Sequence, residues 1–242
     1  MIKKLILVGA GPGDPELISL KGVKALQQAN VVMYDALVSE ELLQHAPNAV
    51  KIFCGKRAGS HYMKQDEINQ QIVEHANKYG IVVRLKGGDP FIFGRGQEEI
   101  EYAEKHGIPS EIVPGISSAT ALATLRQIPL TKRGITESVW ITTGTTSCGE
   151  LSEDIELAAQ STATVVILMG IGKLAEIVNL FTKYKTEHYP IAIIQNGTLP
   201  DEKIVCGHLS TIQQKVQEVN ISSPAVIIVG KVVDCSQIQH IR

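Results

Sequence analysis

The sequence lacks the cysteine and histidine patterns that mark metal-binding proteins. Its 4 cysteines, at positions 54, 148, 206 and 235, include no CxxC pair, and its 7 histidines include no pair at metal-ligand spacing. We therefore predict no metal site. Cysteines this far apart in the chain favour reduced, mostly buried thiols.

Long apolar runs are also absent, which bears on the membrane. The longest uncharged apolar run, around residues 163–171, falls well below the roughly 18 residues that a membrane-spanning helix needs. The apolar run at residues 5–10 is too short for a secretory signal, and Gly11 follows it directly. The sequence accordingly predicts a soluble, cytoplasmic protein.

Neither sign of charge is in excess. The 23 basic and 25 acidic side chains leave a net charge of −2. Nothing in this balance indicates a surface for nucleic acid or for a membrane. A polyanionic ligand would need a local basic patch, which the overall charge does not reveal.

Short apolar segments alternate with amphipathic patterns along the whole chain. The segments that indicate strands lie at residues 5–8, 31–34, 50–53, 81–85, 111–113, 139–141, 163–168, 191–194, 203–206 and 225–229. Helical patterns lie at residues 17–26, 40–46, 66–76, 97–106, 119–123, 174–181 and 209–219, with Asp66 as an expected N-cap. This order predicts an α/β protein in two halves, with domains at 1–114 and 115–242.

The stretch at residues 84–96, RLKGGDPFIFGRG, is the most informative loop of the chain. Gly87 and Gly88 carry no Cβ, so a ligand can approach their backbone closely. Asp89 and the proline after it favour a turn. The apolar residues 91–93 lie in a loop, where no helix or strand obliges them to face a core. The loop suits a ligand with an apolar ring and a charged end; a tight turn with buried aromatics is the alternative.

A second glycine-rich loop, GAGPGD, follows the first strand and invites a dinucleotide-binding interpretation. The acidic Asp35 stands about 20 residues further on, as that fingerprint asks. However, Asp14 occupies the place of the third glycine, and Pro12 lacks an N–H for a pyrophosphate. A nicotinamide-dependent oxidoreductase is therefore disfavoured, and a methyltransferase of the Rossmann type has similar weight.

Eight segments, in order along nearly the whole chain, resemble motifs of the tetrapyrrole (corrin/porphyrin) methyltransferases. They are VGAGPGDPELISLKG, VVMYDALVS, GKRAG, LKGGDPFIFGRG, IVPGISSA, IPLTKRG, MGIGKL and IIQNGT. The resemblance implies the tetrapyrrole methylase fold of class III methyltransferases, in which two α/β domains have a cofactor cleft between them. It also implies a homodimer that uses S-adenosyl-L-methionine.

The activity that the resemblance implies is the C-methylation of uroporphyrinogen III at two ring carbons. The product would be precorrin-2, on the route to sirohaem and cobalamin. Two alternatives stay open: a sibling methyltransferase that acts on a later precorrin, and a non-enzymatic tetrapyrrole-binding protein. Under each of them the partner is a small-molecule tetrapyrrole.

Residues matching the family motifs are the implied site. The cofactor-binding set is Pro12, Gly87, Gly88, Asp89, Ile92, Ser117, Ser118, Met169 and Gly197. The implied acid–base pair is Asp35 and Lys56. Asp35 also ends a predicted strand, where open α/β sheets place reactive groups. Alternatively, Asp35 caps a turn and Lys56 anchors a propionate.

A substrate with acetate and propionate groups calls for cationic side chains. The candidates are Lys56, Arg57, Arg95, Lys132 and Arg133. Two positions depart from the family pattern. Thr145 stands where a histidine is usual, and Gln97 stands where a second glycine is common.

Overall fold

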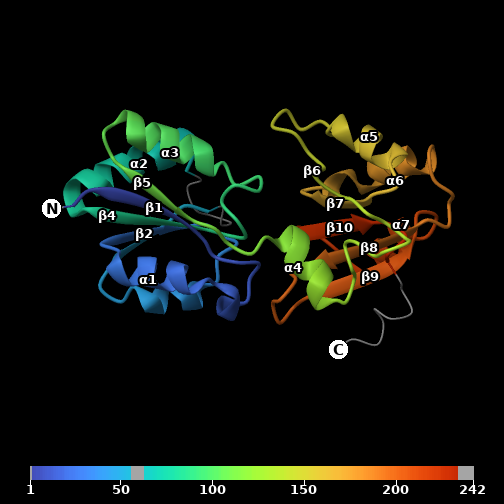
Figure 1. Cartoon of the computed structure of the whole chain (residues 1–242), viewed down its shortest axis with the longest axis horizontal. Helices are drawn as coiled ribbons and strands as arrows, with labels where there is room; N and C mark the ends of the chain where they lie inside the picture. Colours follow the sequence, from blue (N-terminus) through green and yellow to red (C-terminus); the bar gives the residue numbers. More distant parts are fainter. Residues whose placement is uncertain (1, 56–62, 234–242) are drawn as a thin grey trace. The chain divides into compact units, whose positions relative to one another are not determined.

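Each half of the chain folds into a sheet of apolar strands covered by helices (Figure 1). The computed structural model describes residues 2–55 and 63–233. The chain divides into two compact units, Met1–Ser117 and Ser118–Arg242. The predicted boundary, after residue 114, lies three residues before this division.

Unit 1 contains a parallel sheet in the order β3-β2-β4-β1-β5. Its strands are β1 (Lys4–Gly9), β2 (Val31–Tyr34), β3 (Val50–Phe53), β4 (Ile81–Lys86) and β5 (Ser110–Val113). The helix α1 (Leu20–Gln28) covers one face, and α2 (Gln65–Tyr79) and α3 (Gly96–Lys105) cover the other (Figure 1). Two short 3-10 helices, η1 (Pro15–Leu17) and η2 (Glu40–His45), complete the unit. Burial of both faces explains why the central strands are apolar without alternation.

Alternation along β4 decides where its two cations point. Val83 and Leu85 pack in the core cluster under α1, and Val82 packs in the cluster under α2 and α3. Successive side chains of a strand point to opposite faces. Arg84 and Lys86 therefore share the face of Val82, beneath α2 and α3, and both are buried.

Unit 2 contains a mixed sheet in the order β6-β7-β10-β8-β9. Its strands are β6 (Val139–Thr143), β7 (Thr164–Leu168), β8 (Pro190–Gln195), β9 (Lys203–His208) and β10 (Ala225–Val229). Its helices are α4 (Ser118–Leu125), α5 (Asp154–Gln160), η3 (Ile171–Lys173), α6 (Leu174–Thr182) and α7 (Ile212–Val219). β10 is antiparallel to both neighbours, and β6 is parallel to β7. The carboxyl ends of β6, β7 and β8 consequently lie at one edge of this sheet.

The structure confirms the α/β class and all of the predicted strands, with shifts of one or two residues at some ends. The helix α5 was not predicted. Asp66 is not the N-cap of α2: the cap is Lys64, whose backbone N–H donates to Glu67 Oε2 at 3.0 Å. Asp66 instead lies in the first turn, where a carboxylate interacts favourably with the helix dipole.

The expectation of reduced thiols holds for two cysteines and is wrong for a third. Cys54 is free and buried, and Cys148 is free and exposed. Cys206 is disulfide-bonded. Across residues 2–55 and 63–233, no helix is long and apolar enough to cross a membrane.

Candidate functional site

Glycines bring three loops together at the carboxyl edge of the unit 1 sheet. A Cβ at Gly115, after β5, would lie 2.2 Å from the carbonyl oxygen of Gly88 and 2.6 Å from the Cα of Gly9. Gly11 and Gly88 exchange backbone hydrogen bonds of 3.2 and 2.7 Å. No side chain fits at Gly115, so the three loops meet there through bare backbone. Pro12 is half-buried beside it.

Asp89 ties the loop after β4 to the end of β5. Its Oδ1 accepts from the backbone N–H of Phe91 at 2.8 Å, and its Oδ2 accepts from the N–H of Gly115 at 3.0 Å. Both carboxylate oxygens thus hold the protein's own backbone. Each oxygen has a second lone pair, so the group keeps capacity to accept from a ligand.

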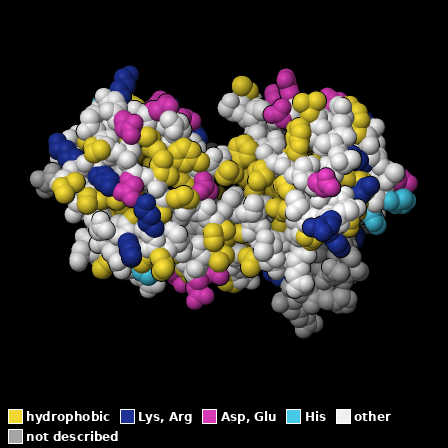
Figure 2. Space-filling model, viewed as in Figure 1, with side chains coloured by type: hydrophobic (Ala, Val, Ile, Leu, Met, Phe, Trp, Pro, Cys, Tyr) yellow, Lys and Arg dark blue, Asp and Glu magenta, His cyan; other side chains and the backbone are white. Residues whose placement is uncertain are grey.

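The apolar residues of this loop are not part of the core. Phe91, Ile92 and Phe93 are 44%, 38% and 46% exposed. The alternative of a tight turn with buried aromatics is therefore wrong. Figure 2 shows that hydrophobic side chains reach the surface of both units. Exposed apolar residues beside bare glycine backbone are suited to a ligand that has both an apolar ring and a polar end.

Asp35 follows β2 at the same edge and carries an ion pair. Its Oδ1 accepts from Arg84 Nη2 at 2.5 Å, and its Oδ2 lies 3.8 Å from Lys86 Nζ. The Asp35 side chain is 27% exposed, whereas those of its partners are almost fully buried. Lys56, the predicted partner of Asp35, lies outside the described residues, as does Arg57.

Behind Asp35 lies a buried charged cluster that sequence reasoning missed. Glu99 Oε1, fully buried on α3, accepts from Lys86 Nζ at 2.8 Å, Gln65 Nε2 at 3.1 Å and Arg84 Nε at 3.3 Å. We call Asp35, Arg84, Lys86 and Glu99 the Asp35 cluster; it contains two cations and two carboxylates. Two bases at alternate positions of an otherwise apolar strand were the signal in the sequence.

Burial and charge act against each other in this cluster. Burial alone would lower the pKa of Arg84, but Glu99 and Asp35 together raise it above its ordinary value. Burial also raises the pKa of the nearby Cys54 thiol to about 11, and Arg84 opposes that rise. Cys54 is therefore a neutral thiol near pH 7, which argues against a nucleophilic role.

Two predicted residues of unit 2, Met169 and Gly197, lie at the carboxyl edge of its own sheet. Met169 follows β7, is 52% exposed and has a left-handed φ of 53°. The hydroxyl of Thr145 donates to the Met169 carbonyl at 2.8 Å. Thr145, which replaces the expected histidine, thus supports the Met169 turn. Gly197 follows β8, and a Cβ there would lie 2.3 Å from Leu122 of α4.

The serine pair spans the division between the units. Ser117 is the last residue of unit 1, and Ser118 is the first residue of unit 2 and of α4. Both are half-buried. The predicted cofactor set is thus split, with Pro12 and residues 87–92 at the edge of one sheet and Met169 and Gly197 at the edge of the other.

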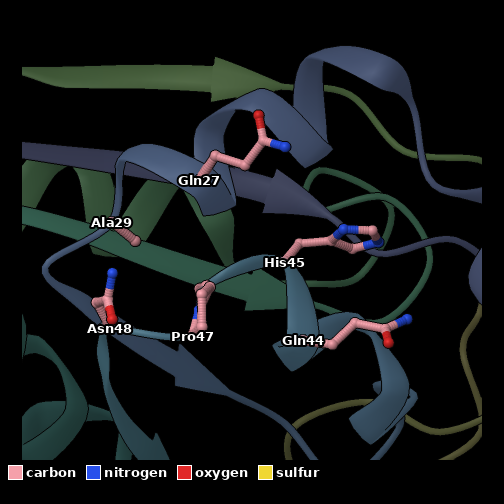
Figure 3. Close-up of a pocket in the computed structure, with 7 residues that line it drawn as sticks. Gln27, Ala29, Gln44, His45, Pro47 and Asn48 are labelled. Atoms are coloured by element: carbon pink, nitrogen blue, oxygen red, sulfur yellow. The ribbon is translucent and has the colours of Figure 1, made fainter.

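A surface pocket of unit 1 contains none of the predicted residues (Figure 3). It is lined by Gln27, Ala29, Gln44, His45, Ala46, Pro47 and Asn48. Ala29 and Asn48 precede β2 and β3, so the pocket lies at the amino edge of the sheet, opposite Asp35. Within the described ranges, no three His, Cys, Asp or Glu side chains are grouped to hold a metal ion.

Comparison with known proteins identifies the family of this chain. The family model described as tetrapyrrole (corrin/porphyrin) methylases matches residues 4–213. A uroporphyrinogen-III C-methyltransferase of Methanocaldococcus jannaschii is 46% identical over 237 residues, which cover 97% of this chain and 98% of that protein.

Two solved structures are similar over nearly their whole length. One is a uroporphyrin-III C-methyltransferase of Thermus thermophilus complexed with S-adenosylhomocysteine, with a TM-score of 0.81, 36% identity and coverage of 95% of this chain and 98% of that one. The other is cobalt precorrin-4 methyltransferase, a cobalamin biosynthetic enzyme, with a TM-score of 0.86, 30% identity and 96% coverage of each chain. The chain therefore belongs to the tetrapyrrole (corrin/porphyrin) methylase family.

Proposed function

We propose that this protein is an S-adenosyl-L-methionine-dependent methyltransferase that converts uroporphyrinogen III to precorrin-2. The observation that carries the proposal is the 46% identity to a uroporphyrinogen-III C-methyltransferase along nearly the whole of both chains. The fold alone does not separate the sibling enzymes, because the precorrin-4 enzyme superposes with the higher TM-score. The precorrin-4 enzyme is 30% identical to this chain, against 46% for the uroporphyrinogen-III enzyme, and this difference favours uroporphyrinogen III as the substrate.

The cofactor residues that we propose have the shapes that such a ligand needs. Gly87 and Gly88 present backbone that no Cβ obstructs. Both positions require glycine, because a Cβ at Gly87 would lie 2.7 Å from Leu37 Cβ and Gly88 has a left-handed φ of 68°. Exposed Ile92 and Met169 are suited to the faces of an adenine ring. The remaining proposed contacts are Pro12, Asp89, Ser117, Ser118 and Gly197. This combination of apolar and polar groups fits S-adenosylmethionine.

The chemistry asks for positioning and for removal of a proton. When bound, S-adenosylmethionine would supply an electrophilic methyl group to the ring carbon, with both electrons of the methyl–sulfur bond remaining on sulfur. The methylated ring then carries a positive charge until one proton leaves it. Asp35 is the group that we propose accepts this proton, because its carboxylate is partly exposed at the carboxyl edge of the sheet. Lys56 is its proposed acid–base partner.

Cationic side chains are proposed to bind the substrate's carboxylates. Arg95 is half-exposed and pairs with Glu98 at 2.6 Å, and Lys132 and Arg133 are exposed in a turn. An arginine can bind a carboxylate through two parallel hydrogen bonds. We further propose a cytoplasmic homodimer as the working form.

A single incubation tests the function. Protein is mixed with methyl-labelled S-adenosylmethionine and uroporphyrinogen III, and the product is identified by mass and absorbance. We expect two labelled methyl groups per tetrapyrrole, with a monomethylated intermediate at early times. Label transferred only to a later precorrin would indicate the sibling activity. Tetrapyrrole binding without transfer to any precursor would indicate a non-enzymatic binding protein, and either result would exclude the proposed activity.

A further inference from the structure

The Asp35 cluster is built so that only one of its members reaches the surface. The side chains of Arg84, Lys86 and Glu99 are 2%, 6% and 0% exposed, against 27% for Asp35. The buried members are thus shielded from a ligand at this edge. Their hydrogen-bonded link to this surface therefore runs through Asp35.

Arg84 is held from four directions. Its Nη1 donates to the carbonyls of Leu85 at 3.3 Å and Met33 at 3.4 Å, and its Nε donates to Glu99 Oε1. These bonds orient the guanidinium so that Nη2 faces Asp35 Oδ1. A planar fork whose nitrogens are all engaged fixes the direction of its partner more strictly than a flexible ammonium group.

Glu99 balances the charge around Asp35. Its Oε1 accepts hydrogen bonds from Arg84 and Lys86, the two cations that also face Asp35. Its Oε2 is buried without a hydrogen-bond partner among the described residues. Without Glu99, two buried cations would act on a single carboxylate. Such a cluster is a costly way to stabilise a fold, because desolvating buried ions often offsets their attraction. A role at the exposed carboxylate explains its presence better.

We infer that Arg84, Lys86 and Glu99 are positioning residues for Asp35, whose Oδ2 accepts the proton. Arg84 holds the carboxylate by Oδ1, Lys86 faces Oδ2 from 3.8 Å, and Glu99 holds both cations in place. The catalytic consequence rests on the proposed function, in which Asp35 removes a proton from the methylated ring. The electrostatic part of the inference does not depend on it. Among the described residues, Arg84 and Lys86 on β4 form ion pairs with Asp35, Glu99 on α3 forms ion pairs with both of these cations, and Cys54 after β3 interacts electrostatically with Asp35.

The first test does not need turnover. Protein is labelled with ¹³C at the aspartate carboxyl groups, and the Asp35 signal is assigned by its loss in Asp35→Asn. We expect the pH midpoint of this signal to rise in Lys86→Met, which removes a facing cation, and to fall in Glu99→Gln, which removes an anion. Lys4→Met is the matched control, since it breaks an ion pair with Glu111 at the amino ends of β1 and β5. It should leave the signal unchanged.

The second test asks whether Arg84 acts through Asp35. Arg84→Lys keeps the charge but loses the fork, and we expect about a 10-fold loss of kcat from a misplaced carboxylate. In an Asp35→Asn background the same change should cost less than about 2-fold, because the two residues act as a unit. Affinity for S-adenosylhomocysteine, measured by calorimetry, should stay within about 2-fold throughout.

Opposite outcomes overturn the inference. A pH midpoint of the Asp35 signal that changes in neither Lys86→Met nor Glu99→Gln would exclude electrostatic control by the cluster. An equal loss of kcat from Arg84→Lys in both backgrounds would make Arg84 merely structural. If Arg84→Lys does not fold, Lys86→Met is compared in its place, alone and in the Asp35→Asn background, and the same criterion for kcat applies. A wild-type protein that fails to methylate uroporphyrinogen III refutes the proposed function instead, while the carboxyl signal still decides the electrostatic part of the inference.

Discussion

At the scale of single residues, Asp35 is the side chain whose environment most favours a chemical role. It is partly exposed, it follows a strand at the carboxyl edge of a parallel sheet, and one of its oxygens is held by a buried arginine. A capping role is the alternative from the sequence. The only hydrogen bond found for the Asp35 side chain, within the described part of the chain, is the one from Arg84.

Replacing Asp35 by asparagine separates these roles. The amide oxygen of Asn can still accept from Arg84, but it cannot take up a proton. We expect turnover to fall by about 10²–10⁴, the range typical of general-base assistance. Cofactor affinity, followed by calorimetry with S-adenosylhomocysteine, should change little. Wild-type turnover at saturating substrate would show that the reaction needs no base at this position.

Asp89 presents a different case, because its carboxylate already has two backbone partners. Asp89→Ala would leave the N–H groups of Phe91 and Gly115 without their acceptor. We expect cofactor affinity to fall by about 2–4 kcal/mol, since the loop that we propose binds the ligand loses its support. Asp89→Asn is the control, as its single oxygen can keep one of the two bonds. Unchanged affinity in a folded Asp89→Ala protein would reduce Asp89 to a turn former.

At the scale of elements, the site of unit 1 depends on how closely the ends of β1, β4 and β5 approach. A Cβ at Gly9 would lie 2.4 Å from the Cα of Gly115, and a Cβ at Gly115 would lie 2.2 Å from the Gly88 carbonyl oxygen. Parallel strands bring their carboxyl ends to one edge, and small residues let the following loops converge there. The arrangement is therefore sensitive to a single methyl group.

Gly115→Ala tests this convergence. The new Cβ would lie 2.2 Å from the Gly88 carbonyl oxygen, so the backbone of one loop must move. We expect a loss of unfolding free energy of about 1–3 kcal/mol, as for other overpacked sites, together with weaker cofactor binding. Gly172→Ala is the matched control, because a Cβ at Gly172 would have no atom within 4 Å. Equal urea midpoints for the two variants would contradict the expected clash.

At the scale of the whole molecule, the proposed cofactor contacts come from both units. Pro12, residues 87–92 and Ser117 belong to unit 1, and Ser118, Met169 and Gly197 belong to unit 2. Each unit has its own apolar core and its own sheet. Binding of S-adenosylmethionine should accordingly require both halves of the chain.

The proposed homodimer is also a property of the whole molecule. One chain has a mass of 26.2 kDa. Light scattering at micromolar concentration should report about twice this value. A mass near that of one chain would refute the dimer without touching the proposed reaction, because the proposed site residues were all assigned within one chain.

Local sequence patterns determined much of this protein. Apolar runs such as residues 31–34 and 225–229 predicted the strands, because strands buried on both faces show no alternation. The glycine loops and the family motifs indicated which loops form the proposed site. The short helix α5 escaped prediction, since its seven residues offer too few turns for a clear periodicity.

Only the tertiary structure decided which charges meet. Arg84 lies 49 residues from Asp35 and 15 from Glu99, and no spacing rule links a strand residue to a partner that follows another strand and to a partner on a helix. In the same way, the hydrogen bond between Asp89 and Gly115 joins positions 26 residues apart. Sheet order and helix packing bring such groups together, and these depend on the burial of the whole core rather than on any local pattern.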